Sequence, residues 1–308
     1  MLNTLSRAEL EEVFSDKFLI SENTNPLYSL NSIEFYQEFF GSSWKNYCSV
    51  FFVDGRPVAI LLMFINQEAS YFGMPGALIC NHSHINSSKY ANILLKSFIS
   101  SSKLLNIHNI KLFSNFNLKI DSAKEIYIKN VFVDLSYSEE IIRSKVRKSY
   151  KSLLNWGVNN MSITIYNNKN ISNKKFKEIQ SFHLLAAKKK TRSDKSWDIQ
   201  YEMILAGNAF LVEAVYQGQL ASASIIIHNS IEAFYGVSIN QESLMIDKLP
   251  INHLVLFRSI IEAKNIGLSK FNFGDTSPTS EVKVNNINNF KNGFARQSEE
   301  KLSYNIHL

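Results

Sequence analysis

The sequence Lys270-Phe271-Asn272-Phe273-Gly274-Asp275, followed after a short gap by Phe290-Lys291-Asn292-Gly293-Phe294, is the most informative part of the chain. The first stretch reads as a β-strand that ends in Gly-Asp. The second places a lysine directly after one phenylalanine and three residues before another. Lys291 and Asp275 are therefore candidate functional residues, separated by a short segment.

The residues before this pair predict a meander of strands, then a helix, then the strand that contains Phe273. The turn Gln217-Gly218-Gln219 separates the first two apolar runs, as in β-hairpins. Gly267 follows the predicted helix in the position where glycine commonly ends one. The elements expected in this half are strands at 209–216, 220–228, 231–237 and 270–273, with a helix at 251–265.

The first half of the chain predicts the same order of elements. The elements expected there are strands at 46–53, 58–65, 69–72 and 110–113, with a helix at 87–105. The repeated order indicates a duplicated α/β (α+β) architecture. Since 308 residues exceed the size of one core, we expect two domains, 1–134 and 135–308. Each would contain a mixed, mainly antiparallel sheet flanked by helices, and the last strand could pack back on the first domain.

The composition is that of a globular protein, with 45% apolar and 19% charged residues. The longest apolar run, 58–65, is far shorter than the roughly 20 residues of a membrane helix. The amino terminus has acidic residues where a signal peptide needs an apolar run, so we expect a cytoplasmic protein. Cys48 and Cys80 are too few and too far apart for a disulfide framework or a zinc site, and reduced thiols are expected.

Positive charge is concentrated between Arg143 and Lys195, where fourteen Lys or Arg accompany two acids, although the whole chain has a net charge of +6. This local excess indicates an anionic partner. The helices expected in and around this segment lie at 138–155, 174–189 and 197–205. Ser138 is the expected N-cap of the first, and Gly157 its end.

On the first of these helices, Arg143, Arg147 and Lys151 recur at four-residue spacing and would share one face. Arg147, its neighbour Lys148, and Arg192 are candidate ligands for the phosphates of a nucleotide or of a tRNA end, because guanidinium groups bind phosphate in a bidentate way. The alternative is an ordinary solvated basic face.

Residues from about 144 to 294 resemble the Fem-type peptidyl and aminoacyl transferases. The FKxGF signature of that family matches Phe290 to Phe294, and the other matching pieces are Lys145-Val146-Arg147-Lys148-Ser149 with Gly157, Tyr235-Gly236-Val237-Ser238, Leu249-Pro250-Ile251 and Phe273-Gly274-Asp275. The first half matches only in its hairpin order and in the turn at 73–76. The resemblance implies two tandem GNAT-like domains, the first degenerate and on the acceptor side, the second carrying the signature.

Two departures from the family pattern have consequences. Asn272 stands where typical members have Asp, so a carboxylate role at that position is not expected. The sequence also has no room for the long coiled-coil arm of some members, which argues against an arm-dependent contact with a large partner.

The resemblance implies that Lys291 lies where the tetrahedral intermediate of acyl transfer develops negative charge, a contact commonly worth about 3–4 kcal/mol. Without the motif, Lys291 would be an ordinary exposed lysine. Asp275 is a candidate general base, although Asp-Thr-Ser-Pro also makes a good turn. Phe290 either contacts substrate or packs beneath Lys291.

Tyr235 and Ser238, at the end of a predicted strand, are candidates to orient the acceptor, with cross-strand packing as the alternative for the tyrosine. His82-Ser83-His84 has no nearby Cys or acidic residue to complete a metal site, and none is expected. No nucleophile-elbow motif is present, so covalent serine chemistry has no support.

No bound cofactor is expected, and the acyl donor would be aminoacyl-tRNA or acyl-CoA. Acyl-CoA enzymes of the GNAT type bind pyrophosphate at a Gly-rich turn before a helix. The corresponding residues here, 245–250, contain an aspartate and a proline and no glycine, which disfavours acyl-CoA in this half.

The sequence therefore predicts a cytoplasmic transferase that moves an aminoacyl or acyl group onto an amine of a cell-envelope precursor. The acceptor would be a nucleotide- or lipid-linked muropeptide or amino sugar of a surface glycan, bound in a cleft between the halves. The alternatives are an acyl-CoA-dependent GNAT N-acyltransferase and a non-enzymatic module that binds RNA or an anionic surface. The oligomeric state is not predicted.

Overall fold

The computed structural model describes residues 5–15, 25–41, 43–118, 120, 123–295 and 297–308. Met1 to Thr4, on which part of the amino-terminal prediction rests, lie outside the described residues. Contacts divide the chain into two compact units, Met1–Ile128 with Glu300–Leu308, and Lys129–Glu299. In the part of the chain that is described, none of the helices is both long enough and apolar enough to cross a bilayer.

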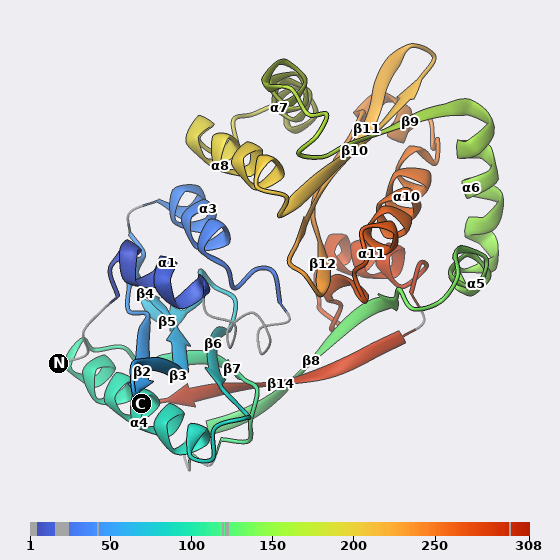
Figure 1. Ribbon diagram of the computed structural model, residues 1–308. Coiled ribbons are helices and arrows are strands. Elements are labelled where there is room, and N and C mark those ends of the chain that lie inside the picture. The colour runs from blue at the N-terminus through green and yellow to red at the C-terminus, as the bar shows by residue number, and fades with distance from the viewer. Residues whose placement is uncertain (1–4, 16–24, 42, 119, 121–122, 296) are drawn as a thin grey trace. The chain divides into compact units, whose positions relative to one another are not determined.

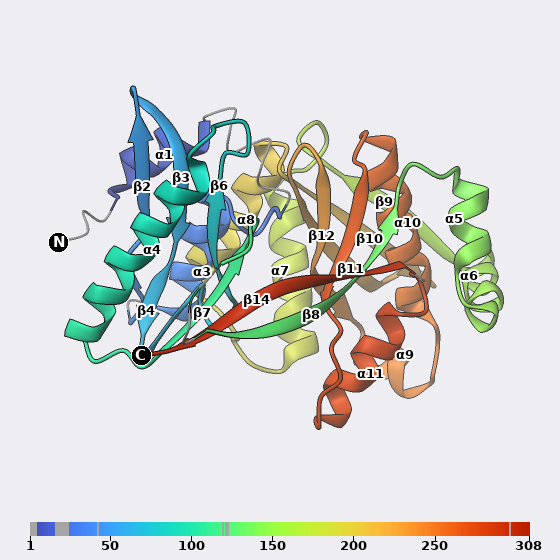
Figure 2. The ribbon, with the colours of Figure 1, turned by 90° about the horizontal axis from the view of Figure 1, so that it is seen from below.

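Unit 1 has a twisted sheet with helices on both faces (Figures 1 and 2). Its elements are α1 (Arg7–Ser15), α3 (Leu30–Phe40), β1 (Lys45–Asn46), β2 (Ser49–Val53), β3 (Arg56–Leu62), β4 (Phe64–Asn66), β5 (Glu68–Ser70), β6 (Gly76–Cys80), α4 (Ser87–Leu104) and β7 (Asn109–Ser114). β3 pairs antiparallel with β2 and β6, and β6 runs parallel to β7. The predicted order of meander, helix and strand is confirmed.

Successive residues of β3 enter two different cores, because side chains of a strand alternate between its faces. Ala59 and Leu61 join the apolar cluster that contains Phe98 of α4. Ile60 and Leu62 join the opposite cluster, which contains residues of α1 and α3. This two-sided burial explains why the strand reads as a continuous apolar run.

The C-terminal strand β14 (Gln297–His307) completes unit 1. Its residues Ser303 to His307 pair antiparallel with β7. Tyr304 and Ile306 are fully buried in the cluster under α4, and the Tyr304 hydroxyl accepts a hydrogen bond from the Leu118 N–H at 3.1 Å. The last residues of the chain are thus part of the core of the unit that forms its beginning.

Unit 2 has a six-stranded sheet in the order β8-β13-β12-β11-β10-β9. Its elements are the end of β8 (Ala123–Asp134), α5 (Glu139–Lys145), α6 (Lys148–Asn160), β9 (Met161–Tyr166), α7 (Asn173–Ala187), α8 (Asp194–Leu205), β10 (Ala209–Tyr216), β11 (Gln219–His228), β12 (Glu232–Asn240), α9 (Glu242–Ile246), α10 (Ile251–Asn265), β13 (Lys270–Asp275) and α11 (Val282–Lys291). All neighbours are antiparallel except β12 and β13, which are parallel.

Helices cover both faces of this sheet (Figures 1 and 2). α10 packs on β10, β11 and β13, and α6 packs on α10. α7 and α8 contact the sheet through β12 and β10. Alternation along β10 assigns the faces: Val212 and Ala214 join the core under α10, whereas Glu213 between them binds Lys175 of α7. The predicted α/β class, with a mixed and mainly antiparallel sheet flanked by helices, is confirmed.

The pairing of β12 with β13 is short. It ends at Phe234, which pairs with Asn272, so the two strands separate beyond this point. A register shift in the β11–β12 ladder, where Ile225 pairs with Val237 and Ile226 with Tyr235, leaves Gly236 as an extra residue. Three of the predicted site residues follow this divergence: Tyr235 and Ser238 on β12, and Asp275 on β13.

The basic helix expected at 138–155 is in fact two helices. Ser138 caps α5 as predicted, since its hydroxyl accepts the Ile141 N–H. α5 ends at Lys145, Val146 has an extended backbone, and Arg147 is not helical either, with φ −48° and ψ 136°, before α6 begins. The interruption has a tertiary cause, because the Arg147 N–H donates to the carbonyl of Gly293 at 2.8 Å. Arg143 and Arg147 therefore do not share a helix face.

Gly157 does not end this segment either. It lies inside α6, where α10 approaches so closely that a Cβ on Gly157 would lie 2.7 Å from Cβ of Leu254. The glycine serves helix packing rather than helix termination, and α6 continues to Asn160.

Candidate active site

Lys291 is the last residue of α11, and the signature that follows it forms a tight turn. The Gly293 N–H donates to the carbonyl of Phe290, and the Phe294 N–H donates to that of Lys291, both at 3.0 Å. The Lys291 side chain is half-buried, and this burial lowers the pKa of its ammonium group, while the Asp275 carboxylate acts in the opposite direction. Lys291 is not the freely solvated lysine of the alternative reading.

Four aromatic rings surround the turn. His253 of α10 lies edge-on to Tyr150 of α6, with ring centroids 4.6 Å apart, and edge-on to Phe290 at 5.2 Å. Phe294 is fully buried and lies 5.3 Å from both Tyr150 and Phe290. The two phenylalanines of the signature thus fix the backbone on either side of Lys291, and the Phe290 ring packs against His253 and Phe294.

Gly293 is required by this cluster. A Cβ on Gly293 would lie 2.0 Å from Cε2 of Tyr150, far inside van der Waals contact. The close approach allows the Gly293 carbonyl to accept the Arg147 N–H. The glycine of the signature is therefore explained by the packing of one tyrosine ring.

Arg147 is brought into the same neighbourhood as Lys291. Its Nη2 donates to the carbonyl of Asn289 at 3.2 Å, and its guanidinium carbon lies 5.1 Å from the Tyr150 ring. Lys148, which is exposed, begins α6, and the first turn of α6 has no acidic residue. These cations at a helix N-terminus add to the positive end of the helix dipole.

Asp275 is exposed. Its carboxylate stabilises a turn and also acts electrostatically on Lys291. Its Oδ1 accepts the Ser277 N–H at 2.7 Å, which is the turn expected for Asp-Thr-Ser-Pro. The other carboxylate oxygen has no part in this bond. Asp275 thus provides the acidic group that favours the charged form of Lys291.

Asn272, where Asp is typical of Fem-type proteins, has a local explanation. Its Nδ2 donates to Oε1 of the fully buried Glu232 at 2.8 Å, and its Oδ1 accepts the Gly274 N–H at 2.7 Å. An amide can make both bonds, whereas an aspartate at this position would bring its carboxylate against that of Glu232. Asn272 therefore positions the Gly274-Asp275 end of β13.

Tyr235 and Ser238 belong to a hydrogen-bonded group at the beginning of α10. Asn252 Nδ2 donates to the Tyr235 hydroxyl at 3.3 Å, and the Ser238 hydroxyl donates to Asn252 Oδ1 at 3.4 Å. Burial raises the pKa of Tyr235, so its phenol stays protonated at neutral pH. The tyrosine also packs edge-on to Phe273 at 6.2 Å, in agreement with the packing alternative.

Arg192 is not brought together with Arg147. It lies in the loop between α7 and α8, and these helices lie away from α5 and α6 (Figure 1). Only 8% of Arg192 is exposed, and its guanidinium carbon lies 3.3 Å from the centroid of the Trp197 ring. Burial lowers its pKa to about 9. This stacking gives Arg192 a role in the packing of the loop.

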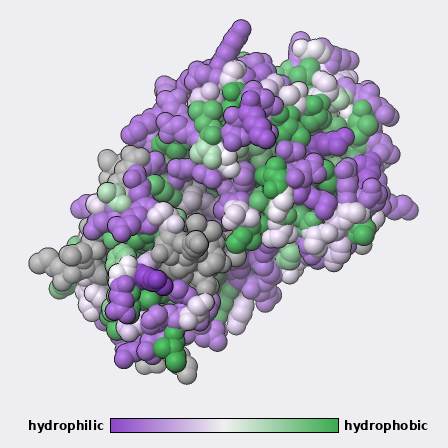
Figure 3. Space-filling view, in the orientation of Figure 1, coloured by the Kyte–Doolittle hydropathy of each residue, from purple (hydrophilic) through white to green (hydrophobic). Residues whose placement is uncertain are grey.

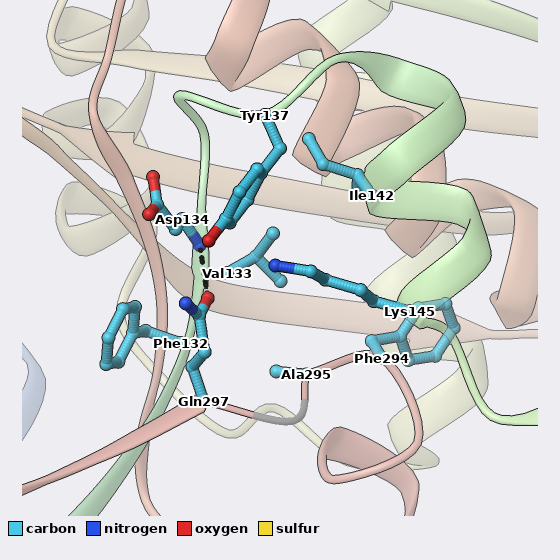
Figure 4. Close-up of a pocket in the computed structure, with 9 residues that line it drawn as sticks. All are labelled: Phe132, Val133, Asp134, Tyr137, Ile142, Lys145, Phe294, Ala295 and Gln297. Carbon is cyan, nitrogen blue, oxygen red and sulfur yellow. Dashed lines mark hydrogen bonds between the residues drawn. The ribbon is translucent and has the colours of Figure 1, made fainter.

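A small pocket behind the signature is lined by Phe132, Val133, Asp134, Tyr137, Ile142, Lys145, Phe294, Ala295 and Gln297 (Figure 4). Lys145 reaches toward the Tyr137 ring, with Nζ 3.2 Å from its centroid, and Gln297 accepts the Asp134 N–H. The cavity volume is about 10 Å³, the space of a single water molecule. The pocket is too small for a substrate, and we interpret its lining residues as packing around Phe294.

Within the described ranges, no three His, Cys, Asp or Glu side chains gather in a way that could hold a metal ion. In the His82-Ser83-His84 segment, the Ser83 N–H is bonded to the Asn81 side chain and the His84 N–H to the Asn81 carbonyl. This is a turn before α4.

Sequence reasoning missed His253 and Tyr150. Burial lowers the pKa of His253 to about 4, so the imidazole is neutral at physiological pH. Among the residues that the structure describes, none reaches its buried Nδ1 with a well-formed hydrogen bond, although the Pro250 carbonyl favours protonation. Neither residue lies near the signature in sequence. The only sequence signal for them was Gly293, because a glycine at a packed position implies a neighbour that leaves no room for a side chain.

With this geometry in place, comparison with known proteins is informative. No protein-family model matches the sequence, and no curated protein matches it. Solved structures do match over nearly the whole chain. FemX has a TM-score of 0.68 at 12% identity, covering 99% of this chain and 97% of its own. The fold is Fem-type and GNAT-like.

Two further structures support this assignment. L-PGS from Bacillus licheniformis has a TM-score of 0.61 at 12% identity, covering 99% of this chain and 93% of its own. A tandem GNAT protein from the clavulanic acid biosynthesis pathway has a TM-score of 0.51 at 11% identity, covering 99% and 97%. The predicted fold of two tandem GNAT-like domains is thus confirmed, and these identities speak for the fold alone.

Proposed function

We propose that this protein is a cytoplasmic transferase that moves an aminoacyl or acyl group onto an amine of a cell-envelope precursor. One observation carries the proposal: Lys291 is half-buried beside Asp275 on a turn fixed by four aromatic rings. The fold adds support, since FemX and L-PGS share it. A cation held in this way is suited to a reaction that develops negative charge on an oxygen atom.

In the proposed reaction, the acceptor amine attacks the acyl carbonyl carbon and forms a tetrahedral intermediate with a negatively charged oxygen. Lys291 donates a hydrogen bond to that oxygen. The amine loses a proton as the new C–N bond forms, and Asp275 is the proposed acceptor of that proton. Collapse of the intermediate breaks the bond to the donor's leaving group and yields an amide.

The donor is proposed to be aminoacyl-tRNA rather than acyl-CoA. The backbone before α10 supports this choice, because N–H groups that would have to face a pyrophosphate are already bonded. Those of Asp247, Lys248 and Leu249 donate to Ser243, Met245 and Leu244, and that of Ile251 donates to Leu249. Arg147 and Lys148 at the start of α6 are the proposed contacts for a phosphate of either substrate.

The acceptor is proposed to be a nucleotide- or lipid-linked muropeptide or amino sugar. Tyr235, Ser238 and Asn252 form an uncharged hydrogen-bonding group beside the diverging strands. Neutral donors and acceptors of this kind suit the amide and hydroxyl groups of a peptide or sugar. Phe290 is proposed to contact the substrate with the part of its ring that the aromatic cluster leaves exposed.

Lys291→Met tests the proposal, with Lys283→Met on the exposed side of the same helix as its matched control. Turnover is measured with labelled aminoacyl-tRNA as donor and with nucleotide-linked muropeptides and amino sugars as acceptors. We expect Lys291→Met to lower turnover about 100-fold or more, with a thermal midpoint close to wild type, and Lys283→Met to change neither. Equal turnover of wild-type and Lys291→Met proteins would remove Lys291 from the mechanism.

A second candidate is an acyl-CoA-dependent N-acyltransferase, favoured only by the shared fold of the tandem GNAT protein. Calorimetric titration with acetyl-CoA separates the two: micromolar binding would favour this candidate. The non-enzymatic alternative, binding of RNA or an anionic surface through the basic helices, predicts that Lys291→Met leaves the protein's function unchanged.

A further inference from the structure

Large apolar side chains are exposed at one end of α7 and on α9. Leu184 and Leu185 near the end of α7 are 49% and 77% exposed. Met245 and Ile246 of α9 are 50% and 71% exposed. Apolar and hydrophilic side chains are interspersed on the face seen in Figure 3, so exposure alone does not identify a binding surface.

An ion pair connects these two segments. Lys188, directly after α7, lies 2.6 Å from Oε2 of Glu242 at the start of α9. We call the set of Leu184, Leu185, Met245 and Ile246, with the lysines at 188–190, the α7–α9 surface. It contains four large apolar side chains from two helices, and the Lys188–Glu242 ion pair links the segments that carry them.

The charge of this surface is positive at its centre. Residues 184–192 contain three lysines and Arg192, and no acid. Among the acids around these lysines, Asp194 binds Lys190 at 2.9 Å and Glu242 binds Lys188, while Asp247, next to Ile246, is followed by Lys248. More than half of each of the four side chains in these two ion pairs is exposed, and exposed pairs are weak enough to exchange for another anion.

We propose that the α7–α9 surface docks on an anionic lipid bilayer. Exposed leucines flanked by lysines match the two requirements of such docking: apolar side chains that enter the headgroup boundary, and cations attracted to the negative leaflet. The surface lies on unit 2, and its α9 part immediately precedes α10 in the chain. The inference does not depend on the proposed transferase activity.

RNA is the competing partner, and the structure disfavours it. A single-stranded RNA surface combines cations with exposed aromatic rings on which bases stack. In this region the aromatic ring next to a guanidinium is Trp197, which is only 3% exposed and already covered by Arg192. The side chains that are exposed here are aliphatic, and they suit lipid better than nucleobases.

Unit 1 provides an internal control. Leu104 and Leu105 at the end of α4 are 86% and 45% exposed, so they form another exposed leucine pair. They have one adjacent lysine, Lys103, rather than a run of three. If apolarity alone caused membrane binding, this pair would contribute as much as the pair on α7.

The test is co-sedimentation of the full chain with vesicles of phosphatidylcholine, with and without phosphatidylglycerol. We expect binding to the anionic vesicles that weakens at high salt, and little binding to the neutral ones. Leu184→Ser with Leu185→Ser should weaken binding at least about tenfold, whereas Leu104→Ser with Leu105→Ser should leave it unchanged. Thermal midpoints verify that both double variants are folded.

Three results would overturn the proposal. The first is wild-type binding by the Leu184 and Leu185 double variant, or equal loss in the Leu104 and Leu105 variant. The second is displacement from vesicles by millimolar glycerol phosphate, which would indicate a headgroup pocket instead of a bilayer surface. The third is binding of bulk tRNA in the absence of any vesicle binding, which would assign these cations to a nucleic acid.

Discussion

Gly293→Ala should destabilise unit 2 through a single contact. The new Cβ would lie 2.0 Å from Cε2 of Tyr150, and ordinary contact begins at 3.4 Å, so the ring would have to move by about 1.4 Å. The ring cannot move freely, because His253 and Phe294 pack against it at 4.6 and 5.3 Å. Gly293 has no positive φ, so backbone strain does not contribute.

The magnitude follows from these contacts. Each aromatic pair is worth about 0.5–1.5 kcal/mol, so loss of two costs about 1–3 kcal/mol, the usual range for overpacking. A domain of this size loses roughly 2–4 °C of thermal midpoint per kcal/mol. Thermal unfolding should therefore show a midpoint lower by several degrees. Asn292→Ala, one residue earlier on the same turn, should stay within about 0.5 kcal/mol of wild type.

A double-mutant cycle isolates the contact. Tyr150→Ala removes the ring, so Gly293→Ala should cost little more once it is present, and the two losses should not add. A Gly293→Ala protein that unfolds at the wild-type midpoint, or two losses that add fully, would refute the assignment of Tyr150 as the reason for this glycine.

Three further outcomes are expected. Asp275→Asn removes the carboxylate that favours the charged form of Lys291, so the pKa of Lys291 should fall. The alkaline limb of the pH–rate profile should therefore move to lower pH. An unmoved limb would show that Asp275 does not influence the titration of Lys291. Since burial holds the pKa of His253 near 4, below its unfolded value of about 6.5, stability should fall as pH decreases between these values, and His253→Phe should reduce this fall in acid unfolding experiments. Asn272→Asp should lower the unfolding free energy by about 1–3 kcal/mol at neutral pH, because it opposes the Glu232 carboxylate, and the loss should shrink in acid; a constant loss at all pH values would exclude charge repulsion.

Much of the fold could be predicted because its sequence signals are local. β10 and α10 have the predicted bounds, 209–216 and 251–265, since turn residues and Gly267 mark their ends. β6 was missed because Gly76–Cys80 is buried on both faces and has no alternation. α11 was missed because it is rich in asparagine, a weak helix former.

The break in the basic helix and the helix α11 show what local signals omit. α11 is held by side-chain bonds to the loop just before it: Asn285 Nδ2 donates to the Thr279 carbonyl, and Asn288 Nδ2 to that of Ser277. The α5–α6 break depends on the Gly293 carbonyl, which lies far along the chain from Arg147. A pattern read within one window does not contain this last contact.

For the candidate site, sequence reasoning named Lys291, Asp275 and Arg147. Arg147 bonds to the turn that follows Lys291, and Asp275 favours the charged form of Lys291. Sequence reasoning grouped Arg192 with them because it read charge and not burial, and this arginine stacks on Trp197 instead. It omitted His253 because a lone histidine in a helix has no distinguishing pattern. The His253 ring packs against both Phe290 and Phe294, and this contact can be seen only in the folded structure.

The pairing of β14 with β7 has a consequence for biosynthesis. The ribosome completes β7 near residue 114, but the strand that covers it ends at His307. At about 5–20 residues per second, the edge of β7 stays open for roughly 10–40 s after it is made. During that interval the nascent chain displays an unsaturated strand that invites association with other chains. Loss of residues 303–307 would remove every pair that β14 makes with β7, so a chain without them should keep this edge of β7 open permanently.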